Sequence, residues 1–220
     1  MKTHHHNRAV VHRRKPQQSR ARQTSWAIQD AFVRLLTKKD YDTITIRDIV
    51  DLAGTGLGSF YEYYANKDNL AKISVHLRTK KLLQTLKDVQ GVATGVSLER
   101  TVQTIIDRLL TLHADHPAHW GAHYLMERRF SSLPTYAKMY ERFVEEWKRI
   151  IFHRCWDHDS KVADVARACL TIAYGMVAHA HIVHLCGIRR PLNQQQLRLQ
   201  LTLALSAYLA ASGHMNKSRR

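Results

Sequence analysis

Histidines are the residues with the most obvious capacity for chemistry in this sequence, which contains fifteen of them. Seven of these histidines form two groups along the sequence: His113, His116, His119 and His123, then His179, His181 and His184. A zinc or nickel site needs three or four converging ligands, and Asp115 could add a carboxylate to the first group. However, Pro117 interrupts that group, and neither group includes a cysteine. We therefore expect packed or surface histidines and no metal site.

A second candidate for a functional site is the glycine pattern Gly54-x-Gly56-x-Gly58, which is similar to a phosphate-binding loop. No strand is expected before it, and no Lys-Ser/Thr pair follows it, so a nucleotide site is not predicted. The sequence also has no nucleophile elbow, no H-E-x-x-H and no Walker motif. We expect no catalytic residue, no cofactor and no enzymatic activity.

The stretch from Thr43 to Leu70 has the pattern of two short helices joined by a tight turn. Thr45 is an N-cap candidate, and Asp48 three residues later completes a capping box. Gly54 lies where a helix ends and the backbone commonly needs a positive φ. Phe60 and Tyr64 share one face and anchor the second helix. The pattern predicts a helix–turn–helix, a motif that places its second helix in a DNA major groove.

Residues 24–70 resemble the N-terminal domain of the TetR (tetracycline-repressor-type) transcriptional regulators. The resemblance is carried by Thr45, Arg47, Asp48, Ile49, Ala53-Gly54, Gly58-Ser59-Phe60-Tyr61 and Asn66-Lys67-Asp68-Asn69-Leu70. It implies a DNA-binding head on a larger helical body, with an effector cavity in the body and a homodimer that binds a palindromic operator.

The resemblance implies DNA contacts along this segment, although two of its positions depart from the family pattern. The candidates are Thr45, Arg47, Leu57, Gly58, Ser59, Tyr61, Tyr63 and Lys67. Arg47 is expected to read a base or a phosphate, because a guanidinium can bridge guanine O6 and N7. Gly56 and Leu57 depart from the family pattern: Gly56 offers no capping side chain, and Leu57 can touch only a thymine methyl. The other candidates are expected to contact the DNA backbone.

The first 24 residues are strongly basic, with seven lysines and arginines and no acid, in a chain of formal net charge +16. We interpret them as a flexible tail or as an arm on DNA phosphates or in a minor groove. Its candidate contacts are Arg13, Arg14, Lys15, Arg20 and Arg22. The first helix is expected over Ser25–Lys39, followed by a turn in which Asp40 replaces the glycine usual in the family.

The remaining residues, 71–220, have the apolar spacing of helices throughout, so the predicted class is all-α. Breaks are expected at Gly91–Gly95, at His116-Pro117 and at the sequence SSLP over 131–134, and Ser97 is an expected N-cap. In the last two helices, 161–186 and 194–211, apolar residues occupy two faces. One face suits the core of its own chain and the other suits a second copy, which predicts a homodimer through these helices.

Aromatic and methionine residues of the body supply candidates for an effector cavity, although such stripes also suit an ordinary core. The candidates are Trp120, Tyr124, Met126, Phe130, Met139, Phe143, Trp147, Tyr174 and Met176. The body holds 22 basic and 11 acidic residues, and its net charge of +11 suits an acidic effector.

Residues 168–188 contain no Asp, Glu, Lys or Arg and are long enough to cross a membrane. Histidines within the segment favour a buried helix instead, so no membrane partner is expected. The odd number of cysteines and the lack of a secretory signal point to the cytoplasm.

The predicted function is a DNA-binding transcriptional regulator, a repressor that a small-molecule effector releases from a palindromic operator. The alternative is a helical ligand-binding or scaffold protein whose basic arm binds acidic partners nonspecifically. The sequence leaves open the effector, the operator and the choice between repressor and activator.

Overall fold

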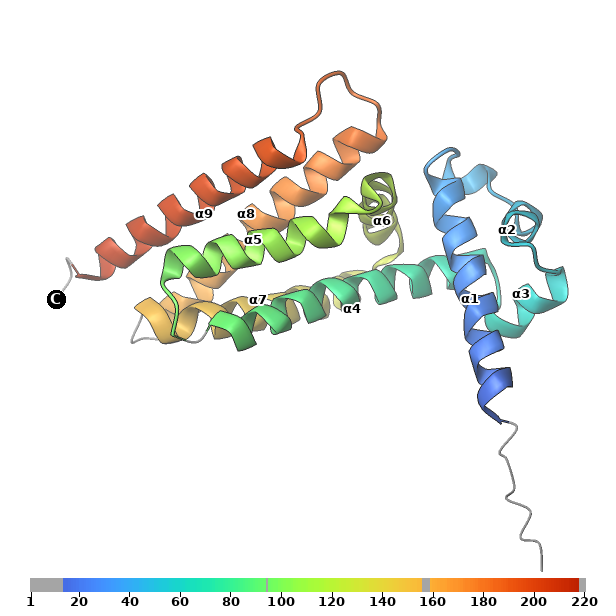
Figure 1. The fold of residues 1–220 in the computed structure, drawn as a ribbon, viewed down its shortest axis with the longest axis horizontal. Coiled ribbons are helices and arrows are strands. Elements are labelled where there is room, and N and C mark those ends of the chain that lie inside the picture. Colours follow the sequence, from blue (N-terminus) through green and yellow to red (C-terminus); the bar gives the residue numbers. More distant parts are fainter. Residues whose placement is uncertain (1–13, 94, 156–158, 218–220) are drawn as a thin grey trace, which may run out of the picture. The chain divides into compact units, whose positions relative to one another are not determined.

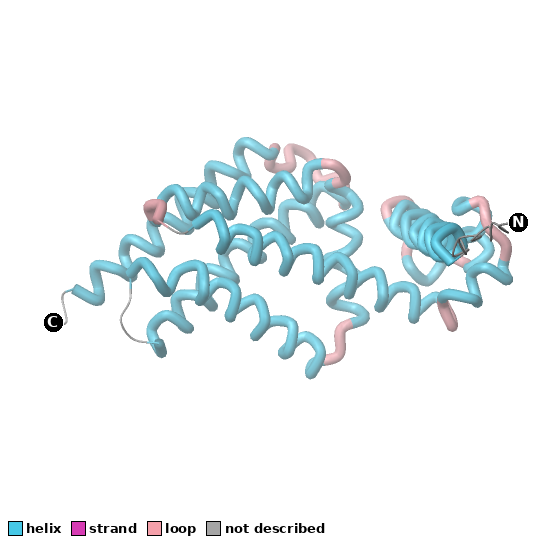
Figure 2. The backbone as a smooth tube through the Cα atoms, turned by 60° about the horizontal axis from the view of Figure 1, so that its bottom comes forward, coloured by secondary structure: helices cyan, strands magenta, loops and turns pink. Residues whose placement is uncertain are grey.

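A computed structural model describes residues 14–93, 95–155 and 159–217 of the chain, and within these ranges it contains helices and no strands. The predicted all-α class is confirmed (Figures 1 and 2). The elements are α1 (Arg14–Leu36), a short 3-10 helix η1 (Tyr41–Thr43), α2 (Ile46–Ala53), α3 (Leu57–Tyr63), α4 (Lys67–Ala93), α5 (Leu98–Ala114), α6 (Pro117–Phe130), α7 (Leu133–Cys155), α8 (Asp159–Leu185) and α9 (Gln194–Lys217). The chain divides into two compact units after Lys67.

Helix α1 begins at Arg14, so residues 14–24 are helical and not part of a flexible arm. The predicted start at Ser25 is wrong for a physical reason. Arg, Lys, Gln and Ala, which make up most of this stretch, are good helix formers. Pro16 lies in the first turn, where a backbone N–H has no partner within the helix and its loss costs nothing. Residues 1–13 of the predicted arm lie outside the described residues.

The first unit packs α1, α2 and α3 around one small core. α1 contacts both α2 and α3, and these two contact each other. Ile28 and Phe32 of α1 are fully buried, as are Ile49 of α2 and Phe60 of α3. Phe32 meets the edge of Tyr41 with ring centroids 6.2 Å apart. The three helices thus share one apolar centre, which fixes α3 against α1.

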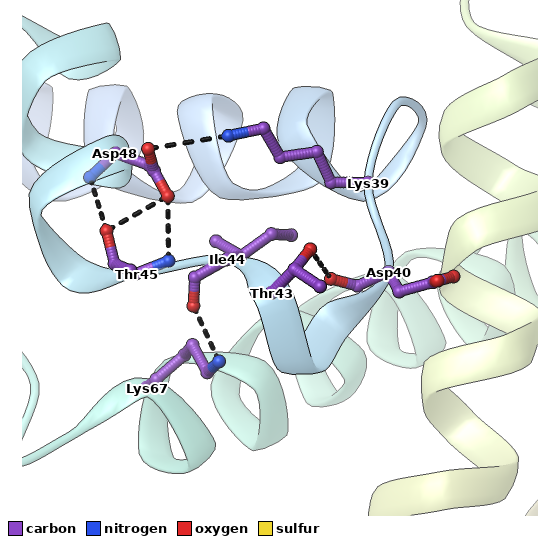
Figure 3. Close-up of polar contacts among 7 residues, drawn as sticks. All are labelled: Lys39, Asp40, Thr43, Ile44, Thr45, Asp48 and Lys67. Carbon is purple, nitrogen blue, oxygen red and sulfur yellow. Dashed lines mark hydrogen bonds and ion pairs between the residues drawn. The ribbon is translucent and has the colours of Figure 1, made fainter.

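The turn after α1 differs from the expectation at Asp40. This residue has φ −63° and ψ 143°, so it is extended and not left-handed. Its carbonyl accepts a hydrogen bond from the Thr43 backbone N–H at 3.0 Å. It also accepts one from the Thr43 hydroxyl at 2.8 Å, which Figure 3 shows. Asp40 therefore starts η1, and the turn needs no residue with positive φ.

Helix α8 is central to the second unit and packs against α6, α7 and α9, while α5 packs against α9. The expected breaks separate the helices: Ser97 caps α5 by accepting from the Arg100 N–H at 3.2 Å, and α6 begins with Pro117. The buried cluster of this unit draws on α4 to α9 and includes Trp147, the largest fully buried side chain.

One helix of the described residues, over Lys161–Leu185 in α8, is long and apolar enough to cross a membrane. Its residues Val162, Ala166, Cys169 and Val177 are buried in the core cluster of the second unit. Burial also raises the pKa of the Cys169 thiol to about 12. The helix therefore has a place in the protein interior.

Helix α9 has the two apolar faces that the sequence predicted. Its inner face, Leu197, Leu201, Leu205 and Leu209, is buried in the core. On its outer face Leu199 is 59% exposed and Leu203 is 61% exposed. This outer face has no cover within the described part of the chain.

Candidate nucleic-acid interface and effector cavity

A capping box starts α2, as predicted. The Thr45 hydroxyl oxygen accepts from the Asp48 N–H at 3.0 Å, and Asp48 Oδ2 accepts from the Thr45 N–H at 2.9 Å (Figure 3). The Thr45 hydroxyl donates to the same carboxylate at 2.9 Å. The hydrogen bond from the Thr45 backbone is the main cause of the lowered pKa of Asp48, and Lys39 adds an ion pair at 3.5 Å. The hydroxyl of Thr45 therefore serves the cap in this structure.

The turn between α2 and α3 is built on Gly54, which is left-handed with φ 65° and ψ 34°. The Thr55 N–H donates to the Val50 carbonyl at 2.9 Å, which closes the end of α2. Gly56 precedes α3 and makes no side-chain cap, as its missing side chain requires. A Cβ added at Gly58 would have no other atom within 4 Å, so the start of α3 has room for the backbone of an approaching molecule.

The DNA-contact candidates of α2 and α3 differ in exposure. Arg47, Leu57, Gly58 and Tyr61 are exposed, with Leu57 at 41% and Tyr61 at 58%. Ser59 and Tyr63 are half-buried. Phe60, between them, is buried against Tyr64 with ring centroids 5.6 Å apart. Among these candidates, the exposed side chains are thus one cation, one apolar residue and one phenol.

Lys67 has a role that the sequence did not reveal. Its ammonium donates to the backbone carbonyls of Tyr41 at 2.8 Å and Ile44 at 2.6 Å, and lies 4.3 Å from the centroid of the Tyr41 ring. Figure 3 shows the bond to Ile44. The side chain therefore fixes η1 and the entry to α2, and its contact with DNA stays a prediction.

Tyr64 also holds the first unit together. Its side chain is 2% exposed, and its hydroxyl lies 2.7 Å from Ser25 Oγ and accepts from Gln29 Nε2 at 2.8 Å. The partners come from α1, 39 and 35 residues away in sequence, so no local pattern could have identified them.

Three residues of α1 that could contact DNA are exposed: Arg20, Arg22 and Trp26, of which Trp26 is 64% exposed. The two arginines were predicted contacts of the basic arm, and the structure places them on a helix instead. Trp26 was missed because an apolar residue in an amphipathic pattern is ordinarily assigned to the core.

The second unit contains a small cavity of about 30 Å³, room for roughly one water molecule. It is lined by Leu82, Leu86, Leu109, His113, Tyr124, Phe143, Trp147, Leu170, Ala173, Tyr174 and Val177. Four predicted pocket residues, Tyr124, Phe143, Trp147 and Tyr174, are therefore brought together at one cavity. Trp120 and Met139 belong to the surrounding core, and the half-buried Phe130 does not line the cavity. A ligand larger than water must displace side chains here.

His113 supplies the cavity with a fixed hydrogen-bond pattern. Its Nδ1 lies 2.6 Å from the Leu109 carbonyl, which can only accept, so this nitrogen carries the proton. Its Nε2 then accepts from the Tyr124 hydroxyl at 2.8 Å. Burial lowers the pKa of His113 to about 3, with a smaller contribution from His181, so the imidazole is neutral.

A buried acid, Glu127, lies three residues after Tyr124 on α6 and therefore on the same face of that helix. Glu127 is 1% exposed and accepts a hydrogen bond from the Tyr174 hydroxyl of α8. Burial raises the pKa of Glu127, and burial together with this carboxylate raises the pKa of Tyr174. The pair therefore links α6 to α8 beside the cavity.

His123 is different from every other buried histidine described. It is 4% exposed, and neither of its ring nitrogens has a hydrogen-bond partner. Burial is the main cause of its lowered pKa, about 3, and the positive charge of Arg78 is the next. Its ring instead contacts those of Trp120 and Tyr124, at centroid distances of 5.6 and 5.3 Å.

The histidine groups do not converge into a metal-ligand set. The closest pairs are His113 with His181, at a ring-centroid distance of 4.6 Å, and His116 with His119, at 4.7 Å. Within the described ranges no three His, Cys, Asp or Glu side chains gather around a possible ion position.

A sequence model of the family described as "Bacterial regulatory proteins, tetR family" matches residues 28–72, from the buried Ile28 of α1 to the first turns of α4. These residues form a TetR-family DNA-binding domain. The match includes the capping box, the Gly54 turn, α3 and Lys67, so the geometry described above is that of the TetR helix–turn–helix.

Among curated proteins, the chain is similar to the uncharacterised HTH-type transcriptional regulator YxbF of Bacillus subtilis (strain 168), with 23% identity over 135 residues. The match covers 59% of this chain and 36% of that protein, so this chain spans about a third of its length.

Solved structures share the whole fold. A TetR family transcription regulator from Marinobacter aquaeolei VT8 superposes with a TM-score of 0.66 at 15% identity, covering 86% of this chain and 97% of that chain. The transcriptional regulator FadR from Bacillus subtilis, solved in complex with stearoyl-CoA, gives 0.60 at 16% identity, covering 82% and 97%. The body therefore has the TetR-family regulator fold as well.

Proposed function

We propose that the protein is a homodimeric, cytoplasmic transcriptional repressor that binds a palindromic operator and releases it when a small molecule occupies the body. The observation that carries the proposal is the TetR helix–turn–helix, whose α2 and α3 expose Arg47, Leu57 and Tyr61 while Phe60 and Tyr64 anchor them. A rigid helix with exposed readers on a packed support is what a major-groove reader requires.

Base recognition depends on few side chains. Arg47 is the exposed cation of α2, and a guanidinium offers two parallel donors to guanine O6 and N7. Leu57 offers an apolar contact to a thymine methyl, and Tyr61 offers a phenol to the DNA backbone. The exposed Arg20 and Arg22 on α1 add positive charge for the phosphates.

The outer face of α9 supports the dimer. Leu199 and Leu203, four residues apart and both more than half exposed, form an apolar stripe on the surface of a single chain. Pairing of two copies through this stripe and α8 buries it and creates a two-fold axis. A two-fold protein matches a palindromic site, with its recognition helices about one DNA turn apart.

The body supplies the place for an effector. Its cavity is lined from α4 to α8, so a ligand that expands it contacts five helices. A ligand needs to favour the non-binding arrangement by only about 3–5 kcal/mol to release most of the DNA.

The test is DNA binding by the full-length protein, using the region upstream of its own gene. Salt-sensitive binding that survives an excess of random DNA is expected for a regulator. Equal competition by random DNA would instead support a helical scaffold with a basic, nonspecific surface. Transcription from the same region, measured with and without the protein, distinguishes repression from activation.

Substitution of Arg47 provides the residue-level test. Arg47→Ala is expected to lower discrimination at one base pair by about tenfold or more, since a bidentate contact contributes about 1–3 kcal/mol. Arg100→Ala, an exposed cation of α5 in the body, is the matched control and should leave the base preference unchanged. Unchanged discrimination in Arg47→Ala would contradict the proposed reading of the groove.

A further inference from the structure

Glu62 is an exposed acid on the helix that the proposed function places in the DNA groove. It belongs to α3, Leu57–Tyr63, and its side chain is exposed to solvent. None of the DNA contacts expected from the sequence is acidic, so local patterns gave Glu62 no role. The sequence of α3, LGSFYEY, contains no other acid and no lysine or arginine. Glu62 therefore sets the side-chain charge of this helix.

Helix geometry places Glu62 on the side of α3 that faces away from the core of the first unit. Phe60 is the buried anchor of α3, and Glu62 is two residues further on, about 200° around the helix axis. Gly58 lies one turn before Glu62 on the same face, and a Cβ added there would have no other atom within 4 Å. Leu57 and Tyr61, also exposed and four residues apart, occupy a second face of α3. The surface around the carboxylate is therefore open to a partner.

The carboxylate of Glu62 makes no hydrogen bond or ion pair within the described part of the chain. Two other acids of the first unit have cationic partners: Asp30 lies 3.9 Å from Arg34, and Asp48 lies 3.5 Å from Lys39. An uncompensated carboxylate on a DNA-binding helix is repelled by the phosphates, whatever the base sequence. Glu62 therefore lowers the general affinity for DNA, and a benefit from this residue must lie in the choice of sequence.

A carboxylate only accepts hydrogen bonds, and this restricts the bases that it can contact. In the major groove guanine presents O6 and N7, and thymine presents O4, all of which are acceptors. Cytosine presents the N4 amino group, which donates, whereas adenine presents the N6 amino group beside the acceptor N7. A carboxylate is therefore attracted to cytosine, attracted less to adenine, and repelled by guanine and thymine.

We propose that Glu62 is a specificity-determining residue, which accepts a hydrogen bond from the N4 amino group of a cytosine in each half of the operator. This assignment rests on the proposed function, because it requires α3 to lie in a major groove. The repulsion from the phosphates adds to the selection, since on other sequences no hydrogen bond offsets it. Arg47 and Glu62 thus have opposite roles in base reading: the guanidinium donates to guanine, and the carboxylate accepts from cytosine.

The experiment selects sites from randomised double-stranded DNA with the full-length protein, and the bound DNA is sequenced. The wild type is expected to prefer cytosine at one position of each half-site by about fivefold or more. Glu62→Gln is expected to shift the preference at that position towards adenine, because an amide accepts from N6 and donates to N7. Glu62→Ala is expected to remove the preference at that position and to leave the other positions unchanged.

Affinity for random DNA is measured on the same variants at low salt. Glu62→Gln and Glu62→Ala should each raise this affinity by about threefold, and added salt should reduce the difference. Glu99→Gln is the matched control, since Glu99 is an exposed acid of α5 in the body and its substitution removes the same charge. It should leave the selected sequences unchanged. Tm of the two Glu62 variants should stay close to that of the wild type, because the replaced side chain is exposed.

Two results would overturn the assignment: a wild type that prefers cytosine at no position, or Glu62 variants that select the same sequences as the wild type. In the second case, tighter binding of random DNA by the variants would show that Glu62 is a solvated charge only. Enrichment of a palindromic site that does not depend on Glu62 upholds the regulator and contradicts the assignment. Failure of the wild type to enrich any sequence contradicts the proposed function and the assignment together.

Discussion

Lys67 ties the turn before α2 to the start of α4 by donating to two backbone carbonyls at 2.8 and 2.6 Å. Lys67→Met removes both bonds, leaving the carbonyls of the buried Tyr41 and Ile44 without that donor. The expected loss of unfolding free energy is about 1–3 kcal/mol, measured by urea unfolding with circular dichroism. Lys39→Met is the control, since an exposed ion pair at 3.5 Å contributes about 0–1 kcal/mol. Equal effects of the two substitutions would show that the Lys67 bonds are dispensable.

The buried histidines make stability depend on pH. His113 and His123 have pKa values of about 3 in the folded protein, against 6.5 when unperturbed. Between these values the unfolded chain binds more protons, so the free energy of unfolding falls as pH is lowered from about 6.5. Each histidine contributes a slope of at most about 1.4 kcal/mol per pH unit.

Urea unfolding between pH 7.5 and 5 measures this slope. His113→Phe and His123→Phe should each make it shallower by the share of one histidine. A slope that neither substitution changes would mean that other groups cause the acid sensitivity.

At the residue scale, the sequence predicted interactions between neighbours and missed those between distant residues. The Thr45–Asp48 box was readable because its partners are three residues apart. The bonds of Lys67 join residues 26 and 23 apart, and those of Tyr64 join residues 39 and 35 apart. His123 could not be separated from His113 by sequence, since only the fold decides which buried nitrogen finds a partner.

Gly121 sets how closely α6 approaches α8. A Cβ at this position would lie 2.5 Å from the His181 carbonyl oxygen and 2.9 Å from Leu185 Cβ. Gly121→Ala is therefore expected to push the helices apart and to cost about 1–3 kcal/mol of unfolding free energy, despite the better helix propensity of alanine. Leu125→Ala, on the exposed side of α6, should change stability by about 0.5 kcal/mol or less. A Gly121→Ala protein as stable as the wild type would contradict the close contact.

Helix boundaries in the body were predictable where the sequence contains glycine, proline or a capping serine. Ser97, Pro117 and the glycine-bearing segment before Ser97 separate α4, α5 and α6 as expected. The start of α1 was not, because Pro16 is compatible both with a flexible tail and with a first helical turn. Local sequence does not distinguish these, and the extent of the helix had to come from the structure.

The proposed dimer uses the outer face of α9. Leu203→Glu places a charge on the apolar stripe and is expected to convert the dimer to monomer in analytical ultracentrifugation and to weaken operator binding. Leu133→Glu is the control, since Leu133 is 87% exposed at the start of α7 and lies outside the stripe. Both leucines are exposed in one chain, so folding of the protomer should be little affected. A Leu203→Glu protein that remains dimeric would place the interface elsewhere.

At this scale the sequence indicated an all-α regulator, because helical periodicity and the segment from Thr45 to Leu70 are local properties. The sequence also predicted that α9 has two apolar faces. Four of the effector-pocket candidates line one cavity in the structure, and their contact with an effector stays a prediction: Tyr124, Phe143, Trp147 and Tyr174. Local patterns did not indicate His113 as a lining residue, because the cavity combines five helices and exists only after they pack.

Trp26 gives the protein an optical label of its own. It is the only tryptophan before residue 120, and it stands 64% exposed on α1, whereas Trp120 and Trp147 are buried in the body. The fourth tryptophan, Trp156, lies outside the described residues and is removed by Trp156→Phe. Indole emission moves to shorter wavelength when the ring leaves water, so in that variant red-edge emission reports Trp26 and blue-edge emission reports the two buried rings. The DNA-binding domain and the body can therefore be followed separately in one cuvette, without attaching a dye to either.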